Sequence, residues 1–114
     1  METPFKCVTT TLADGHLVTV HGEVDLLTAP QLAETLAQFA NGTIRVDISA
    51  VTFLDSSGLH ALLAAHRYVT RAGRRMIVCG PLDPTVQQMF EITGLDDVFE
   101  IHESTRPEAE ERAS

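Results

Sequence analysis

Cysteine is scarce in this sequence: the 114 residues include only two, Cys7 and Cys79, which are far apart. Neither belongs to a CxxC pair or to a cysteine–histidine ligand spacing, which argues against a structural zinc site. Both stand among apolar residues typical of strands. We therefore interpret them as small buried side chains with free thiols. A disulfide between them is not expected in a reducing cytoplasm.

Long hydrophobic runs are also missing from the sequence. No apolar stretch approaches the ~20 residues that a membrane-spanning helix needs. The first residues carry neither the basic segment nor the apolar core of a secretory signal. We therefore expect a cytoplasmic protein without a membrane partner.

Positive charge is in short supply, because 8 Lys and Arg stand against 16 Asp and Glu, with a formal net charge of −8. Contacts with phosphates need clustered cations, so a nucleic-acid partner is not expected. The one basic cluster consists of Arg67, Arg71, Arg74 and Arg75. We interpret it as cations near a helix C-terminus, where the negative end of the helix dipole favours them.

Motifs of enzymes and of nucleotide-binding proteins are absent. There is no P-loop, no GxGxxG and no paired metal-ligand motif. A hydrolase with a nucleophile elbow needs Gly-x-Ser-x-Gly, of which only Ser56-Ser57-Gly58 is present. His60 and His66 fall on the helical pattern that follows, and neither has the spacing of a base for Ser57. We therefore expect no catalytic centre, no cofactor and no metal.

The hydrophobic pattern predicts strands and helices in alternation. Residues 5–12 and 16–21 are rich in β-forming side chains and flank turn residues, which indicates a β-hairpin. Helical spacing follows in three segments, each closed by a glycine that is suited to a helix end. The expected helices span 30–40, 59 to a cap at Gly73, and 84–93; the expected further strands span 43–48, 75–79 and 98–101.

The resulting β-β-α-β-α-β-α-β order predicts an α/β fold. Crossovers of this kind place parallel strands side by side with right-handed connections. Three to four helices are enough to cover mainly one face of a single mixed β-sheet. We expect residues 1–104 to form one domain. Residues 105–114 are expected to be an acidic C-terminal tail, either a short helix or a disordered end.

Two adjacent serines stand at the predicted start of the second helix, in Asp55-Ser56-Ser57-Gly58. A hydroxyl at such a junction can accept a hydrogen bond from the first helical turn, so we interpret one serine as the N-cap. Two hydroxyls exceed the need of one cap, and Gly58 leaves the second serine unshielded. A phosphate here would add roughly −1.5 to −2 charges, which a helix N-terminus tolerates. The pattern is typical of a site that can be modified without loss of the fold.

A second polar segment, Gly22–Pro30, lies between the second strand and the first helix. Asp25 or Thr28 is suited to cap that helix. Loops that leave successive parallel strands at the same edge converge, so we expect Asp25 to lie near the serines. A cap residue can also belong to an interface.

Two sequence blocks, in this order, resemble a known family. They are Gly22–Asp25 with Thr28-Ala29-Pro30, and Val46–Leu59 with its Asp-Ser-Ser-Gly. The chain from Phe5 to Ser104 resembles the STAS domains, and within them the bacterial anti-sigma-factor antagonists (anti-anti-sigma factors). The second block is specific, whereas the first alone is weak.

The resemblance implies a partner switch in which the protein itself catalyses nothing. The partner would be an anti-sigma factor with serine kinase activity, which binds the unphosphorylated protein and releases a sigma factor. Phosphorylation at Ser57, with Ser56 as the second choice, would abolish that binding, and a metal-dependent serine phosphatase would reset the switch. ATP would belong to the partner. The residues expected to bind the partner are Asp25, Thr28, Asp55, Ser56, Ser57, Gly58 and Leu59.

Other functions remain open at this stage. The same fold serves as a constitutive scaffold module in stress-signalling or lipid-transport complexes, and STAS-like sheets can host small ligands. A hydrolase that uses Ser57 would react with a serine-directed fluorophosphonate probe, and we expect no labelling. The sequence names neither the sigma factor nor the kinase.

Overall fold

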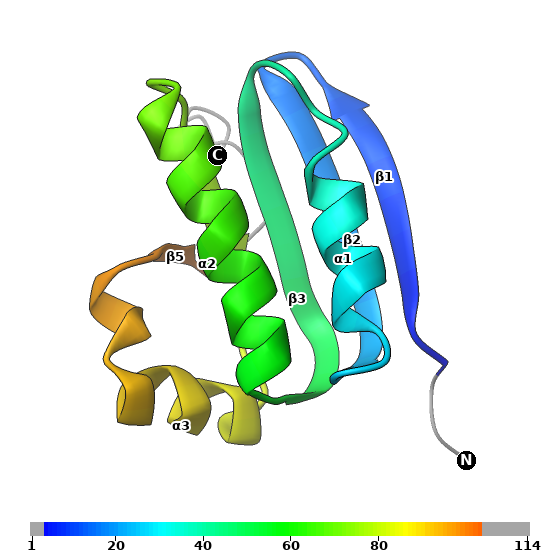
Figure 1. Cartoon of the computed structure of the whole chain (residues 1–114), viewed down its shortest axis with the longest axis vertical. Helices are drawn as coiled ribbons and strands as arrows, with labels where there is room; N and C mark the ends of the chain where they lie inside the picture. The colour runs from blue at the N-terminus through cyan, green and yellow to red at the C-terminus, as the bar shows by residue number, and fades with distance from the viewer. Residues whose placement is uncertain (1–3, 104–114) are drawn as a thin grey trace.

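Five strands form one mixed sheet in the computed structural model, which describes residues 4–103 (Figure 1). The strand order is β1-β2-β3-β4-β5; β1 is antiparallel to β2, and all other neighbours are parallel. The elements in chain order are β1 (Lys6–Leu12), β2 (Gly15–Val24), α1 (Ala29–Leu36), β3 (Thr43–Leu54), α2 (Ser56–Arg71), β4 (Met76–Cys79), α3 (Pro84–Thr93), the 3-10 helix η1 (Leu95–Asp97) and β5 (Glu100–His102).

The core lies between the sheet and its helices. Alternate residues of β2, including Val18 and Val20, are buried, as are Ile44 and Val46 of β3. Period-two burial on the strands meets the apolar stripes of the helices, because each element hides one face. Helices α1 and α2 lie side by side over this face, and α3 lies near the end where α2 begins (Figure 1). The predicted α/β fold, a mixed sheet with three helices on it, is confirmed.

Helix α1 is shorter than the sequence indicated. It ends at Leu36 and not near residue 40, with Ala37 as its C-terminal cap. Phe39 has helical spacing from the buried residues but lies outside the helix, where its ring stacks on His16 of β2 with 4.2 Å between ring centroids. The helical spacing of apolar residues thus extended past the real end of α1, because Phe39 is apolar for its contact with β2 and not as part of the helix.

Strand β3 is longer than predicted and runs to Leu54, six residues beyond the expected end at Ile48. Its second half pairs with β2 through partners such as Gly22 with Val51, after one register shift, and Val24 with Leu54, after a second. Pairing with a neighbouring strand overrides the weak local preference of this segment. No loop therefore separates the sheet from the residue that precedes α2.

The structure of the last part of the described chain agrees closely with the prediction from local sequence signals. Helix α3 begins at Pro84 after the capping residue Asp83, and it ends at Thr93 before the C-cap Gly94, whose φ of 73° lies in the left-handed region. The final strand is shifted by one to two residues from the prediction. No helix within residues 4–103 is long and apolar enough to cross a membrane. The acidic tail expected at residues 105–114 lies outside the described residues.

Both cysteines have free thiols, as predicted. Cys79 is buried in β4, whereas Cys7 on β1 is only half-buried. Burial raises the pKa of the Cys7 thiol, and a hydrogen bond with Thr35 lowers it by less. The Cys7 thiol is therefore less readily ionised than that of a free cysteine, which is unfavourable for reactivity.

Candidate functional site

The start of α2 is joined directly to the end of β2. The Asp55 N–H donates a hydrogen bond of 3.1 Å to the Val24 carbonyl oxygen, just beyond the paired ends of β2 and β3. Parallel strands end at the same edge of a sheet, so the loop after β2 and the N-terminus of α2 meet there. The expected convergence of the segment that begins at Asp25 with the two serines is thus confirmed.

The N-cap of α2 is Asp55, so the prediction that a serine caps the helix was wrong. Asp55 has extended backbone angles (φ −97°, ψ −173°), and its carboxylate accepts a hydrogen bond of 3.1 Å from the Gly58 N–H. Because β3 continues to Leu54, Asp55 is the residue at which the extended chain becomes a helix. Ser56 and Ser57 are then the first two helical residues.

Neither serine hydroxyl is used by the fold. Within residues 4–103, the side chains of Ser56 and Ser57 make no hydrogen bond. Ser56 is exposed, whereas Ser57 is half-buried. A hydroxyl that supports no internal contact can be modified at little cost to stability, and the positive end of the helix dipole favours an added anion there.

Gly58 has a packing role that the sequence did not indicate. It is buried, and a Cβ at this position would lie 2.5 Å from Leu54 Cδ1 and 2.8 Å from Val24 Cγ1. The absence of a side chain therefore lets the first turn of α2 pack onto β2 and β3. Leu59 is also buried in the core. Both residues position the serines, and direct contact of either with a partner stays a prediction.

Substitution of Gly58 by alanine is expected to destabilise the protein. Overpacking costs about 1–3 kcal/mol, which the better helix propensity of alanine offsets by up to ~1 kcal/mol. We expect a net loss of roughly 1–2 kcal/mol in the free energy of unfolding, measured by urea denaturation. Ser56→Ala is the control and should stay within about 0.5 kcal/mol of the wild type. A Gly58→Ala protein as stable as the wild type would contradict the close packing described.

The loop between β2 and α1 is held by a compact set of hydrogen bonds. The Asp25 carboxylate accepts from the N–H groups of Leu27 (3.0 Å) and Thr28 (3.1 Å). The Thr28 hydroxyl accepts from the Asp25 N–H and donates to the Glu23 carbonyl oxygen. Thr28 occupies the N-cap position of α1, but its side chain caps no helical N–H. The side chains of Asp25 and Thr28 therefore do not cap α1 as expected. Their hydrogen bonds hold the loop closed instead.

The closed loop presents two leucines to solvent. The exposed fraction is 74% for Leu26 and 87% for Leu27. Two adjacent large apolar side chains with this exposure form an exposed apolar patch on the loop, a feature found at protein–protein contacts. Neither residue was predicted from the sequence. An apolar pair in a turn, outside any periodic segment, was the signal that could have indicated them.

A groove of about 590 Å³ separates the N-terminal parts of α1 and α2 and contains both serines. Apart from the serines and His60, its lining is apolar and mostly small. Small side chains on facing helices leave space between them, which creates the groove. The lining residues are Leu26, Ala29, Pro30, Ala33, Ser56, Ser57, His60, Ala61 and Ala64.

The chain belongs to the STAS domain family. A family model described as the STAS domain matches residues 8–108. An anti-sigma-B factor antagonist of Listeria monocytogenes is 35% identical over 85 residues, which cover 72% of this chain and 74% of the relative. That of Staphylococcus aureus is 33% identical over 103 residues, or 88% and 94% of the two chains. Within the family, this chain groups with the anti-sigma factor antagonists.

Solved structures support the same assignment. An anti-sigma factor antagonist from Mycobacterium paratuberculosis has a TM-score of 0.79 at 25% identity, over 92% of each chain. The anti-sigma factor antagonist SpoIIAA in its unphosphorylated form has a TM-score of 0.72 at 24% identity, over 96% of each chain, and this likeness concerns the fold.

Proposed function

We propose that this protein is an anti-sigma factor antagonist controlled by phosphorylation of Ser57. The unphosphorylated form binds an anti-sigma factor that is itself a serine kinase, and this binding frees a sigma factor. The phosphorylated form releases the partner, and a metal-dependent serine phosphatase restores it. The protein acts by binding alone, in the cytoplasm, and carries out no chemistry of its own.

The observation that carries the proposal is the position of Ser57. Its hydroxyl makes no hydrogen bond within the described chain, and it lies in an apolar groove beside the exposed Leu26. The cap of α2 depends on Asp55 and Gly58 and leaves Ser57 free. A phosphate on Ser57 would thus leave the helix intact and change only the surface that a partner contacts.

The groove makes the modification effective against binding. A partner that covers Ser57 removes it from water, and its neighbours are apolar apart from Ser56 and His60. A buried dianion without a matching cation is costly, and unpaired charges at interfaces commonly cost about 2–5 kcal/mol. Asp55, two residues away, adds negative charge of the same sign.

We propose Ser57 and not Ser56 as the phosphorylation site because Ser57 is the more buried of the two serines. Ser56 is exposed at the first helical position, whereas Ser57 is half-buried. A phosphate on Ser56 could stay in water at the edge of an interface. One on Ser57 would have to lie beneath the partner.

The proposal is tested by phosphorylation of the purified protein. It is incubated with Mg-ATP and each candidate anti-sigma serine kinase of the same cell, and the phosphate is located by mass spectrometry. We expect one kinase to modify Ser57, with no phosphate on Ser57→Ala and full modification of Ser56→Ala. If no candidate kinase modifies the chain and the Ser57 variants bind their partner like the wild type, the protein is a constitutive scaffold module instead.

A further inference from the structure

The arginine cluster predicted at the end of α2 divides into two pairs with different surroundings. Arg74 Nε donates a hydrogen bond of 3.1 Å to the Gly42 carbonyl oxygen, and Arg75 forms an ion pair with Glu100. Arg71 lies in the last turn of α2, but Arg67 lies a full turn earlier. The helix dipole, which acts within the last turn, therefore accounts for only one of the two remaining cations.

Arg67 and Arg71 have no compensating charge in the described part of the chain. Both are exposed, and neither forms an ion pair within residues 4–103. The chain as a whole has a net charge of −8. Two free guanidinium groups one helical turn apart thus form a local positive site on an acidic protein.

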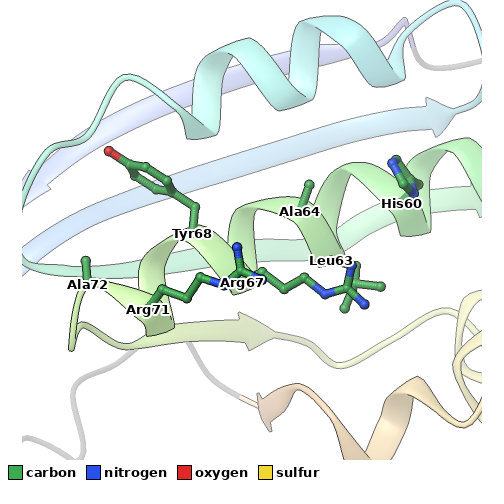
Figure 2. A pocket seen from close by; sticks show the side chains of 7 residues that line it. All are labelled: His60, Leu63, Ala64, Arg67, Tyr68, Arg71 and Ala72. Atoms are coloured by element: carbon green, nitrogen blue, oxygen red, sulfur yellow. The ribbon is translucent and has the colours of Figure 1, made fainter.

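The two arginines belong to a hollow on the outer side of α2, shown in Figure 2. Its volume is about 540 Å³. Arg67 and Arg71 extend along the exposed side of the helix, and Tyr68, 63% exposed, lies on the side that faces α1. We name Arg67, Tyr68 and Arg71 the arginine face. Arginine and tyrosine are the residue types enriched where proteins bind one another.

The arginine face is continuous with the groove that holds the serines. His60 and Ala64 line both the hollow and the groove, so the two form one strip along α2. A partner that covers Ser57 therefore has the arginine face within the same contact area. The end of the strip that holds the serines is mainly apolar, and the opposite end carries the positive charges of Arg67 and Arg71.

We propose that the arginine face binds a carboxylate-rich segment of the partner that docks on the Ser57 groove; this inference rests on the proposed function. Guanidinium groups form forked, charge-assisted hydrogen bonds with carboxylates. An acidic segment is repelled by most of this chain and attracted here. The arginine face thus sets the orientation of the partner and speeds its approach.

The test compares two variants with the same change of net charge. Arg67→Gln with Arg71→Gln removes two positive charges, and Lys6→Glu changes the net charge equally on the exposed edge strand β1. Binding to the purified anti-sigma factor is measured by surface plasmon resonance at several salt concentrations. We expect the double variant to bind about tenfold more weakly, chiefly through a slower association rate and with a shallower salt dependence. The Lys6 variant should stay within about twofold of the wild type.

Two further variants separate failure of this inference from failure of the proposed function. Arg67→Lys with Arg71→Lys keeps the charge and should retain most of the association rate. If the double glutamine variant binds like the wild type while Ser57→Glu binds about 30-fold more weakly, the arginine face has no role in docking. Binding to phosphatidylglycerol vesicles is measured in parallel for the wild type and the double glutamine variant. The inference is equally overturned if the double glutamine variant loses vesicle binding but binds the anti-sigma factor like the wild type. If Ser57→Glu binds like the wild type, the proposed function itself fails.

Discussion

Phosphorylation of Ser57 is expected to weaken binding to the anti-sigma factor by about 30- to 4000-fold, which corresponds to 2–5 kcal/mol. Ser57→Glu carries a smaller charge and should fall near the lower limit of that range. Ser57→Ala should bind as tightly as the wild type, because the hydroxyl makes no hydrogen bond in the described chain. The cause is the burial of a charge in a groove whose lining is mainly apolar.

Isothermal titration calorimetry with the purified partner measures these dissociation constants. Ser56→Glu is the matched control, since it adds the same charge one residue away at an exposed position. It should change the affinity by no more than about threefold. The unfolding midpoint of each glutamate variant should equal that of the wild type or exceed it, because acidic residues are favourable in the first helical turn. Equal weakening by both glutamate variants would show that Ser57 has no special position in the interface.

Phe90→Ala is expected to lower the free energy of unfolding by about 3–5 kcal/mol. The ring of Phe90 is 0% exposed and projects from α3 into the core, with its centroid 5.6 Å from that of Phe99. Removal of the ring loses the transfer free energy of the aromatic group and leaves a cavity. Small domains have a total stability of about 5–15 kcal/mol, so this one substitution removes a large part of it.

The loss is measured by urea denaturation followed by circular dichroism, and an unchanged slope of the transition confirms two-state behaviour. Ile92→Ala is the control on the same helix, because that side chain is 73% exposed. It should change the stability by less than about 0.5 kcal/mol. A loss below about 1 kcal/mol for Phe90→Ala would mean that α3 is not an integral part of the core.

Local signals in the sequence were sufficient to predict the fold class and the bounds of α3. Asp83 and Pro84 start that helix and Gly94 ends it, and all three act through their own backbone geometry or bonds to near neighbours. The hairpin of β1 and β2 was equally readable, because turn residues stand between two segments rich in β-forming side chains. The Asp-Ser-Ser-Gly motif likewise indicated the candidate site, because it stands where strand passes into helix.

Several features of the site depended on contacts that join distant segments. The length of β3 and the identity of the N-cap follow from pairing with β2, which lies on the other side of α1 in the sequence. Gly58 is required because Val24 and Leu54 lie against it, and no pattern near Gly58 shows both neighbours. Arg74 and Arg75 differ from the two free arginines because they contact Gly42 and Glu100, which are likewise distant in the sequence.

The sequence by itself thus determined the order of the elements and the position of the serine pair that we propose as the modification site. Only the tertiary structure decided which serine is half-buried in the groove, that Leu26 at the groove and its neighbour Leu27 are exposed, and which of the four arginines lack an ion pair or hydrogen bond in the described residues. The physical reason is the distance along the sequence over which the deciding interactions act. Caps, turns and alternation are settled within a few residues, whereas burial and charge pairing depend on which strands and helices pack together.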